Sequence, residues 1–253
     1  MDEEKVISPA RSPDSATTPV VRPKKPADLR SDPGTEPRTR IDAERVLREA
    51  LAALLSAYPS SDDPDDEVEA SFWNASVSVM ASVDSVLVRH EVFVSELREK
   101  VCRLREIVSN EDLLHIVDHA LAIQLHERLS MDLDARTFWQ GALRFHLDSF
   151  LGLLMPAGST RSRQLVNLLE SFHYHSVAWR QRAYNVARAV FGLNARQQIE
   201  RLLLGLALEK HPEMPSVDLR WLARKAGISV ELGWKEMVND AVARWRQLSG
   251  VLE

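Results

Sequence analysis

Apolar side chains recur along this chain at steps of three and four, the spacing of one face of a helix. The first such segment carries Val46, Leu47, Leu51, Leu54, Leu55 and Tyr58, and Tyr58-Pro59 closes it. The same spacing predicts further helices over residues 64–108, 110–129, 132–156, 160–191, 194–212, 217–226 and 231–248. A step near Ser82–Asp84 leaves open whether the second of these segments is one helix or two, so the pattern predicts about nine helices.

The placement of turn-forming residues agrees with helices. No Gly occurs between Gly34 and Gly141, and no Pro occurs between Pro64 and Pro156. A β-rich chain needs turn residues about every 8 to 12 positions. The sequence therefore predicts an all-α fold, a multi-helix bundle.

One part of the pattern is typical of a coiled-coil seam. From Leu87 to Val108 the steps of three and four alternate without interruption. Such a seam can pack within the chain or bind a second copy. Self-association would then use Leu87, Val94, Leu97, Val101, Leu104 and Val108.

Composition divides the chain into three parts. Residues 1–40 hold 7 of the 12 prolines and little that could be buried, which predicts a disordered Pro-rich leader. Residues 41–192 are expected to form a helical bundle and residues 193–253 a C-terminal helical subdomain, although one domain or two remains open. An acidic start without an apolar core, and no membrane-length apolar run, lead us to expect a cytoplasmic protein.

The net charge of −5 conceals a strong asymmetry. Residues 41–135 carry 8 basic and 20 acidic side chains, a balance of −12. Residues 136–201 carry nine basic and three acidic ones, a balance of +6, and all nine bases are Arg. Arg suits carboxylates and phosphates. The partner of these arginines could be the acidic half of this chain or of a second copy, an acidic protein, or nucleic acid. The partner-binding candidates are Arg161, Arg163, Arg180, Arg182, Arg188 and Arg196.

A segment near the C-terminus resembles the first helix and turn of a helix-turn-helix motif. Leu222, Ala223, Ala226, Gly227 and Ile228 carry the resemblance, with Gly227 expected in the left-handed turn position. It implies that nucleic acid would be contacted through Arg220, Arg224 and Lys225. The likeness weakens after residue 229, because the would-be reading helix carries Glu231, Glu236 and Asp240, which repel phosphates.

The sequence carries little catalytic chemistry. Cys102 is the only cysteine, and no nucleophile elbow or phosphate-binding loop is present. His115 and His119 are four residues apart, the weak metal candidates, but the helical wheel places them opposite the apolar stripe. No metal or other cofactor is predicted.

We therefore expect a non-enzymatic regulatory or adaptor protein that acts by protein–protein interaction through its acidic and Arg-rich helical faces. One alternative is a DNA-binding transcriptional regulator that uses the segment resembling a helix-turn-helix. A second alternative is a helical-bundle metal-dependent enzyme.

Overall fold

The computed structural model describes residues 39–60, 64–127, 134–154, 193–211 and 217–249, together with Arg180 and Ala183. These residues form eight α-helices and no strand, which confirms the all-α prediction. The helices are α1 (Arg40–Ser56), α2 (Asp65–Arg89), α3 (Leu97–Ile107), α4 (Glu111–Gln124), α5 (Ala135–Leu154), α8 (Ala195–Glu209), α9 (Leu219–Ala226) and α10 (Trp234–Ser249). Residues 1–38 of the predicted leader and most of the predicted helix 160–191 lie outside the described residues, while Thr39 and Arg40 cap and begin α1.

Side-chain caps begin most of these helices at the positions that the sequence indicates. The side chains of Asn110 and Asp134 accept the backbone N–H groups of Leu113 and Thr137, so α4 and α5 begin after them. Asn194 and Gln197 form a reciprocal capping box at the start of α8. The apolar spacing predicts these three starts at residues 110, 132 and 194, within three positions of the observed ones.

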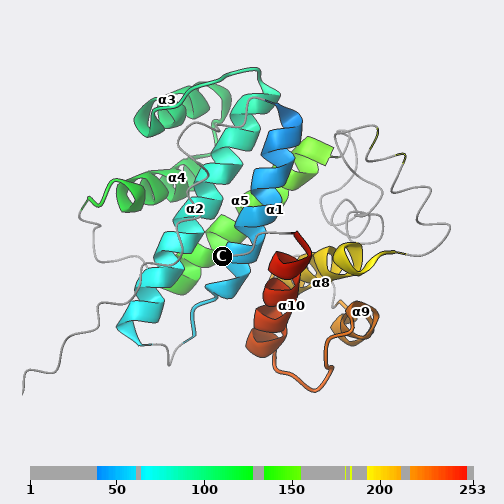
Figure 1. Ribbon diagram of the computed structural model, residues 1–253. Coiled ribbons are helices and arrows are strands. Elements are labelled where there is room, and N and C mark those ends of the chain that lie inside the picture. The colour runs from blue at the N-terminus through cyan, green and yellow to red at the C-terminus, as the bar shows by residue number, and fades with distance from the viewer. Residues whose placement is uncertain are drawn as a thin grey trace, which may run out of the picture.

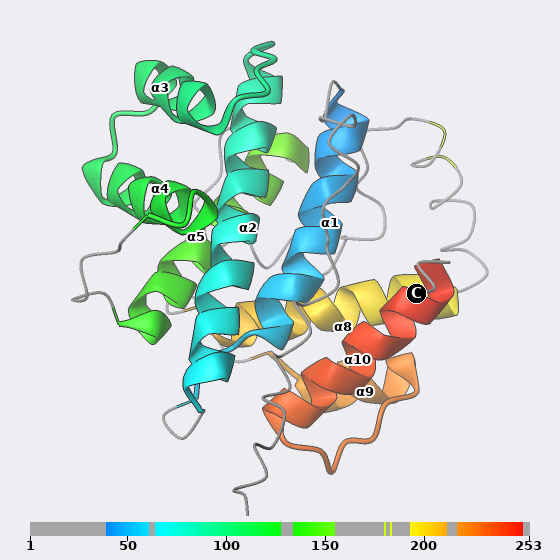
Figure 2. The same ribbon diagram turned by 60° about the vertical axis from the view of Figure 1, so that its left-hand side comes forward.

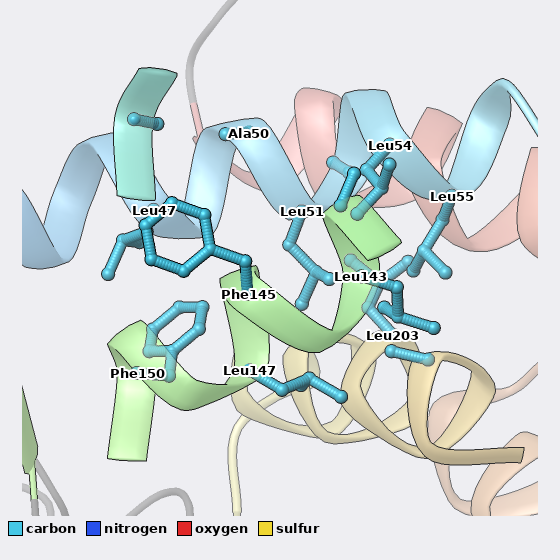
Figure 3. Packing of buried hydrophobic residues seen from close by; sticks show 14 of the residues in the cluster. Leu47, Ala50, Leu51, Leu54, Leu55, Leu143, Phe145, Leu147, Phe150 and Leu203 are labelled. Atoms are coloured by element: carbon cyan, nitrogen blue, oxygen red, sulfur yellow. The ribbon is translucent and has the colours of Figure 1, made fainter. Parts of the chain in front are cut away.

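Helices α1, α2 and α5 form the centre of the bundle (Figure 1). Helices α3 and α4 lie on one side of them, and α8, α9 and α10 lie on the other (Figures 1 and 2). In Figure 3 the leucines of α1 point toward α5 and its Leu143, and Leu203 of α8 belongs to the same buried cluster. The largest fully buried side chains are Trp139, Phe138 and Phe150, all on α5.

The sequence left open a break near Ser82–Asp84, and the structure places the break further along the chain, inside the predicted seam. Helix α2 ends at Arg89, and residues 90–96 lead into α3. Glu91 adopts the left-handed conformation at φ 60°, the N–H of Val92 bonds to the carbonyl of Leu87, and the N–H of Glu91 bonds to that of Val88. This is a Schellman motif, which ends a helix and normally uses Gly at the left-handed position.

The broken helix separates the predicted seam into two elements. Leu87 of α2 and Val101 and Leu104 of α3 are buried in the core of this chain. Val94, Leu97 and Val108 are half-buried at the edge of α3. Self-association through these six residues stays a prediction, and the three buried ones could join it only by leaving the core.

The three C-terminal helices attach to the bundle through α8. Both α9 and α10 pack on α8, while α8 and α10 also contact α1. One connected cluster of buried residues includes Leu47 of α1, Phe150 of α5, Leu203 of α8 and Trp245 of α10. The division at residues 192 and 193 stays a prediction. None of the described helices combines the length and apolar character needed to span a membrane.

Candidate interaction surface

Most of the predicted partner-binding arginines are not placed by the structure. Arg161, Arg163, Arg182 and Arg188 lie outside the described residues. Arg180 is described and exposed, and it takes part in an interaction. Arg196 is therefore the predicted residue whose surroundings can be examined in detail.

Arg196 belongs to a charge network between α8 and α1. Its Nε lies 3.0 Å from Oε1 of Glu200, one turn along the same helix. The other oxygen of Glu200 lies 3.1 Å from Arg48 of α1, and Arg48 lies 2.8 Å from Glu44. The side chains of Arg48 and Glu200 are only 16% and 15% exposed. This alternating chain, Glu44–Arg48–Glu200–Arg196, is the α1–α8 junction.

The junction is a demanding environment for a charged group. Burial raises the pKa of nearby Glu49, although Arg45 and Arg196 act in the opposite direction. Charges placed here must be partnered, because an unpaired ion out of contact with water is costly. This cost applies to Arg48 and Glu200, whereas Arg196 is the exposed end of the network, with 48% of its side chain exposed.

A different arrangement occurs on α9. The side chain of Asp218 caps its start by accepting the N–H of Trp221, and Gly227 ends it at φ 71°. The N–H of Ile228 returns to the carbonyl of Ala223, so the end is a Schellman motif with the glycine in its usual place. The sequence prediction for Gly227 is confirmed.

The two faces of α9 differ completely. Leu222 and Ala223 are buried against the core, and a Cβ at Gly205 of α8 would collide with Leu222, so the two helices approach closely. The fully exposed side of the helix carries only cationic and aromatic residues, namely Arg220, Trp221, Arg224 and Lys225. We call these four residues the α9 face.

Trp221 is the centre of the α9 face. It is 40% exposed, one of the few large apolar residues at the described surface. The guanidinium of Arg201, from α8, lies 5.0 Å from its ring centroid, and the ammonium of Lys225 lies 5.9 Å away. These are cation–π distances, so the indole is held among cations and still reaches solvent.

The charges of the α9 face have no acidic partner within the described part of the chain. Arg224 donates through Nε to the carbonyl of Arg220 at 3.3 Å, and Lys225 lies over Trp221. Neither arginine nor the lysine forms an ion pair with a described carboxylate. The sequence identified the three cations, but it missed Trp221, whose signal is its position beside them on the outer side of an eight-residue helix.

The resemblance to a helix-turn-helix extends over α9 and its turn but not beyond. Residues 227–233 connect α9 to α10, whereas the motif uses a turn of about three or four residues. On α10, Glu236 is exposed, and Asp240 pairs with Arg244 at 3.1 Å. The acids that weaken the likeness in the sequence are therefore present on the helix that would read DNA.

The weak metal candidates lie together on α4. The rings of His115 and His119 meet edge to face with their centroids 4.4 Å apart. Burial and the proximity of His115 lower the pKa of His119, which favours the neutral form. Among the described residues no group of three or more His, Cys, Asp and Glu side chains is arranged to hold a metal ion. The pair therefore lacks a third ligand in this part of the chain.

One buried polar pair was not predicted. Oγ of Ser78 on α2 lies 2.8 Å from Nδ1 of His146 on α5, and both residues are 0% exposed. Burial lowers the pKa of His146 to about 3. Serine and histidine at this distance form part of a hydrolase site elsewhere, but a substrate could not reach a fully buried pair. The pair joins α2 to α5.

Comparison with known proteins gives this chain no relative: no family model matches it, and no similar curated protein or solved structure was found.

Proposed function

We propose that this protein is a non-enzymatic regulatory or adaptor module that binds an acidic protein partner through the α9 face. The observation that carries the proposal is the exposed Trp221, with the ammonium of Lys225 over its ring and with Arg220 and Arg224 exposed on the same helix. None of these three cations pairs with a described carboxylate. Trp and Arg are the residues most enriched among the energetic centres of protein interfaces.

The chemistry of the face defines the partner. Two arginines one helical turn apart offer forked donors to two carboxylates. The exposed indole of Trp221 offers a flat apolar surface to an aromatic or long aliphatic side chain. A partner that presents acidic residues around one such side chain would satisfy both features. Four further predicted partner-binding arginines, at 161, 163, 182 and 188, lie outside the described residues and stay predictions.

A DNA-binding regulator is the first alternative. A tryptophan among cations can stack on a base, and the cations can contact phosphates. Against this, the chain as a whole has a net charge of −5, and residues 202–253 carry equal numbers of basic and acidic side chains. Proteins that bind nucleic acid usually present a net basic domain. The acidic protein partner is the better fit. The second alternative, a metal-dependent enzyme, gains no supporting geometry from the described residues.

The test compares defined probes of equal charge. An acidic peptide with one central Trp or Leu, a duplex DNA and a single-stranded DNA would each be titrated into the full chain at several salt concentrations. We expect the peptide to bind, with affinity falling as salt rises. The variant Arg220→Glu with Arg224→Glu should abolish binding, and Trp221→Ala should weaken it about tenfold or more.

A matched control reverses two other exposed arginines, Arg136 and Arg144 of α5, which changes the net charge by the same amount. This control should retain most of the binding. Equal loss in both double variants would mean that only net charge matters and would overturn the proposed site. Tighter binding of duplex DNA than of the peptide, lost with Arg220→Glu and Arg224→Glu, would establish the regulator instead.

A further inference from the structure

Three aromatic rings meet where α1, α5, α8 and α10 come together. Tyr58, just after α1, packs edge to face on Trp139 with ring centroids 5.0 Å apart. It also packs against Trp234, the first residue of α10, at 4.8 Å. Hydrogen bonds orient both indoles, since Nε1 of Trp139 donates to the carbonyl of Leu54 and Nε1 of Trp234 donates to that of Leu206. The rings are therefore held in place by the backbones of α1 and α8.

The ammonium of Lys210 occupies this cluster. Its Nζ lies 4.8 Å from the centroid of Tyr58 and 4.8 Å from that of Trp234. Lys210 is the C-cap residue of α8, and no carboxylate forms an ion pair with it in the described part of the chain. Two aromatic faces at cation–π distance are thus the neighbours that replace the usual anion.

We propose that Tyr58 and Trp234 form an alkylammonium-binding site whose resident ligand is Lys210, and that this contact is a charge-dependent latch between the bundle and the C-terminal helices. Each of the three residues comes from a different element: Tyr58 follows α1, Lys210 ends α8 and Trp234 begins α10. Occupancy of one site by the chain's own cation therefore fixes three elements at once.

The contacts around the site indicate which helices the latch holds. The indole hydrogen bonds of Trp139 to Leu54 and of Trp234 to Leu206 do not involve the lysine. Helix α9 is held separately, by Leu222 against Gly205 in the middle of α8. Loss of the positive charge should therefore loosen the start of α10 and the end of α8, while α9, α3 and α4 keep their packing.

The test separates charge from packing by substitution. Lys210→Met removes the charge and keeps an unbranched apolar stem, whereas Lys210→Arg keeps a cation. We expect the methionine variant to lower the Tm by about 3–6 °C and the arginine variant by less than about 2 °C. Hydrogen exchange should accelerate in Trp234–Val238 and Ala207–Lys210 of the methionine variant. Arg103→Met, which removes exposed ion pairs within α3, is the control and should change neither measurement appreciably.

Chemical rescue identifies the ligand class. In Lys210→Ala the vacated site should accept n-butylammonium, which raises the Tm of this variant more than that of the wild-type chain. Neutral 1-butanol at the same concentration should give no such gain. Equal rescue by butanol, or equal Tm losses for the methionine and arginine variants, would show that only the apolar stem matters and would overturn the proposal.

Discussion

The α1–α8 junction and the α9 face use similar residues in opposite ways. In the junction, Arg48 lies between Glu44 and Glu200, and Arg196 completes the alternation. On the α9 face, Arg224 donates to the backbone carbonyl of Arg220 in the same helix, and neither arginine pairs with a described carboxylate. An arginine whose neighbours are all acids of its own chain contributes to stability, whereas an exposed one beside an exposed tryptophan is available to another molecule.

The difference follows from desolvation. Removing water from an ion costs far more than an exposed ion pair returns, so the half-buried charges of the junction must be matched to each other. No such constraint acts on the α9 face, where water solvates the guanidinium groups. The two regions should therefore respond differently to substitution, and their responses can be ranked.

The largest effect on stability is expected on the buried side of α9, where the helix packs against α8. Leu222 is 4% exposed and packs against Gly205, so Leu222→Ala leaves a cavity between α9 and α8. We expect a loss of about 3 kcal/mol in the free energy of unfolding, measured by urea denaturation. Peptide binding should fall with it, because the four exposed residues lose their support. A loss below about 1 kcal/mol would mean that α9 is not anchored through this leucine.

The second largest effect on stability concerns His146, which is fully buried in its neutral form. His146 has its pKa lowered to about 3, against an ordinary value near 6.5. The folded state therefore favours the neutral ring, and its contribution is fully present above pH 6.5 and is lost as the pH falls toward 3. The loss should approach about 1.4 kcal/mol per pH unit in that window, or roughly 2 kcal/mol between pH 6.5 and pH 5.

A matched variant isolates this effect from the titration of carboxylates. His146→Asn keeps an acceptor for Ser78 but does not titrate in this range, so its unfolding free energy should fall less steeply below pH 6.5 than that of the wild-type chain. Parallel curves for the two chains would show that His146 becomes protonated without unfolding the protein.

The sequence predicted the helices better than it predicted their ends, and the three Schellman motifs explain why. All three have the same hydrogen bonds, with a left-handed residue at Glu91, His126 or Gly227. Only Gly227 is a glycine, and only the helix end at Gly227 was predicted correctly from the sequence. At Glu91 and His126 the local preference disfavours a positive φ, so tertiary packing decides the end, and the predicted helices ran too long.

The same distinction applies to the candidate sites. The cations at 220, 224 and 225 could be identified from residue type and spacing. The sequence could not show whether a charge is paired, because Glu200 and Arg48 form an ion pair although they lie 152 positions apart in the chain. Arg196 and Arg220 look alike in the sequence, and only the fold assigns one to a network and the other to the surface. The Lys210 contact is equally invisible, since Tyr58 and Trp234 are far apart in sequence.

A smaller effect tests the junction directly. Glu200→Ala removes the acid between Arg48 and Arg196 and leaves two like charges close to each other. We expect a loss of about 1.5 kcal/mol in the free energy of unfolding. The control is Glu106→Ala, which removes a carboxylate 63% exposed that pairs with Arg103, and its cost should stay below about 0.5 kcal/mol. Equal costs would remove the distinction between the junction and an ordinary surface pair.

The smallest effect on stability is expected on the α9 face itself. Arg220→Ala with Arg224→Ala removes two exposed cations that pair with no described acid, so the free energy of unfolding should change by less than about 0.5 kcal/mol. Binding of the acidic peptide should nevertheless weaken about tenfold or more, and its dependence on salt should become shallower because two charged contacts are lost. A loss of stability as large as that of Glu200→Ala would place these arginines in an internal network like that of the junction. Unchanged binding at unchanged stability would leave the two arginines with neither role, and the contrast between the two regions would then rest on Trp221 alone.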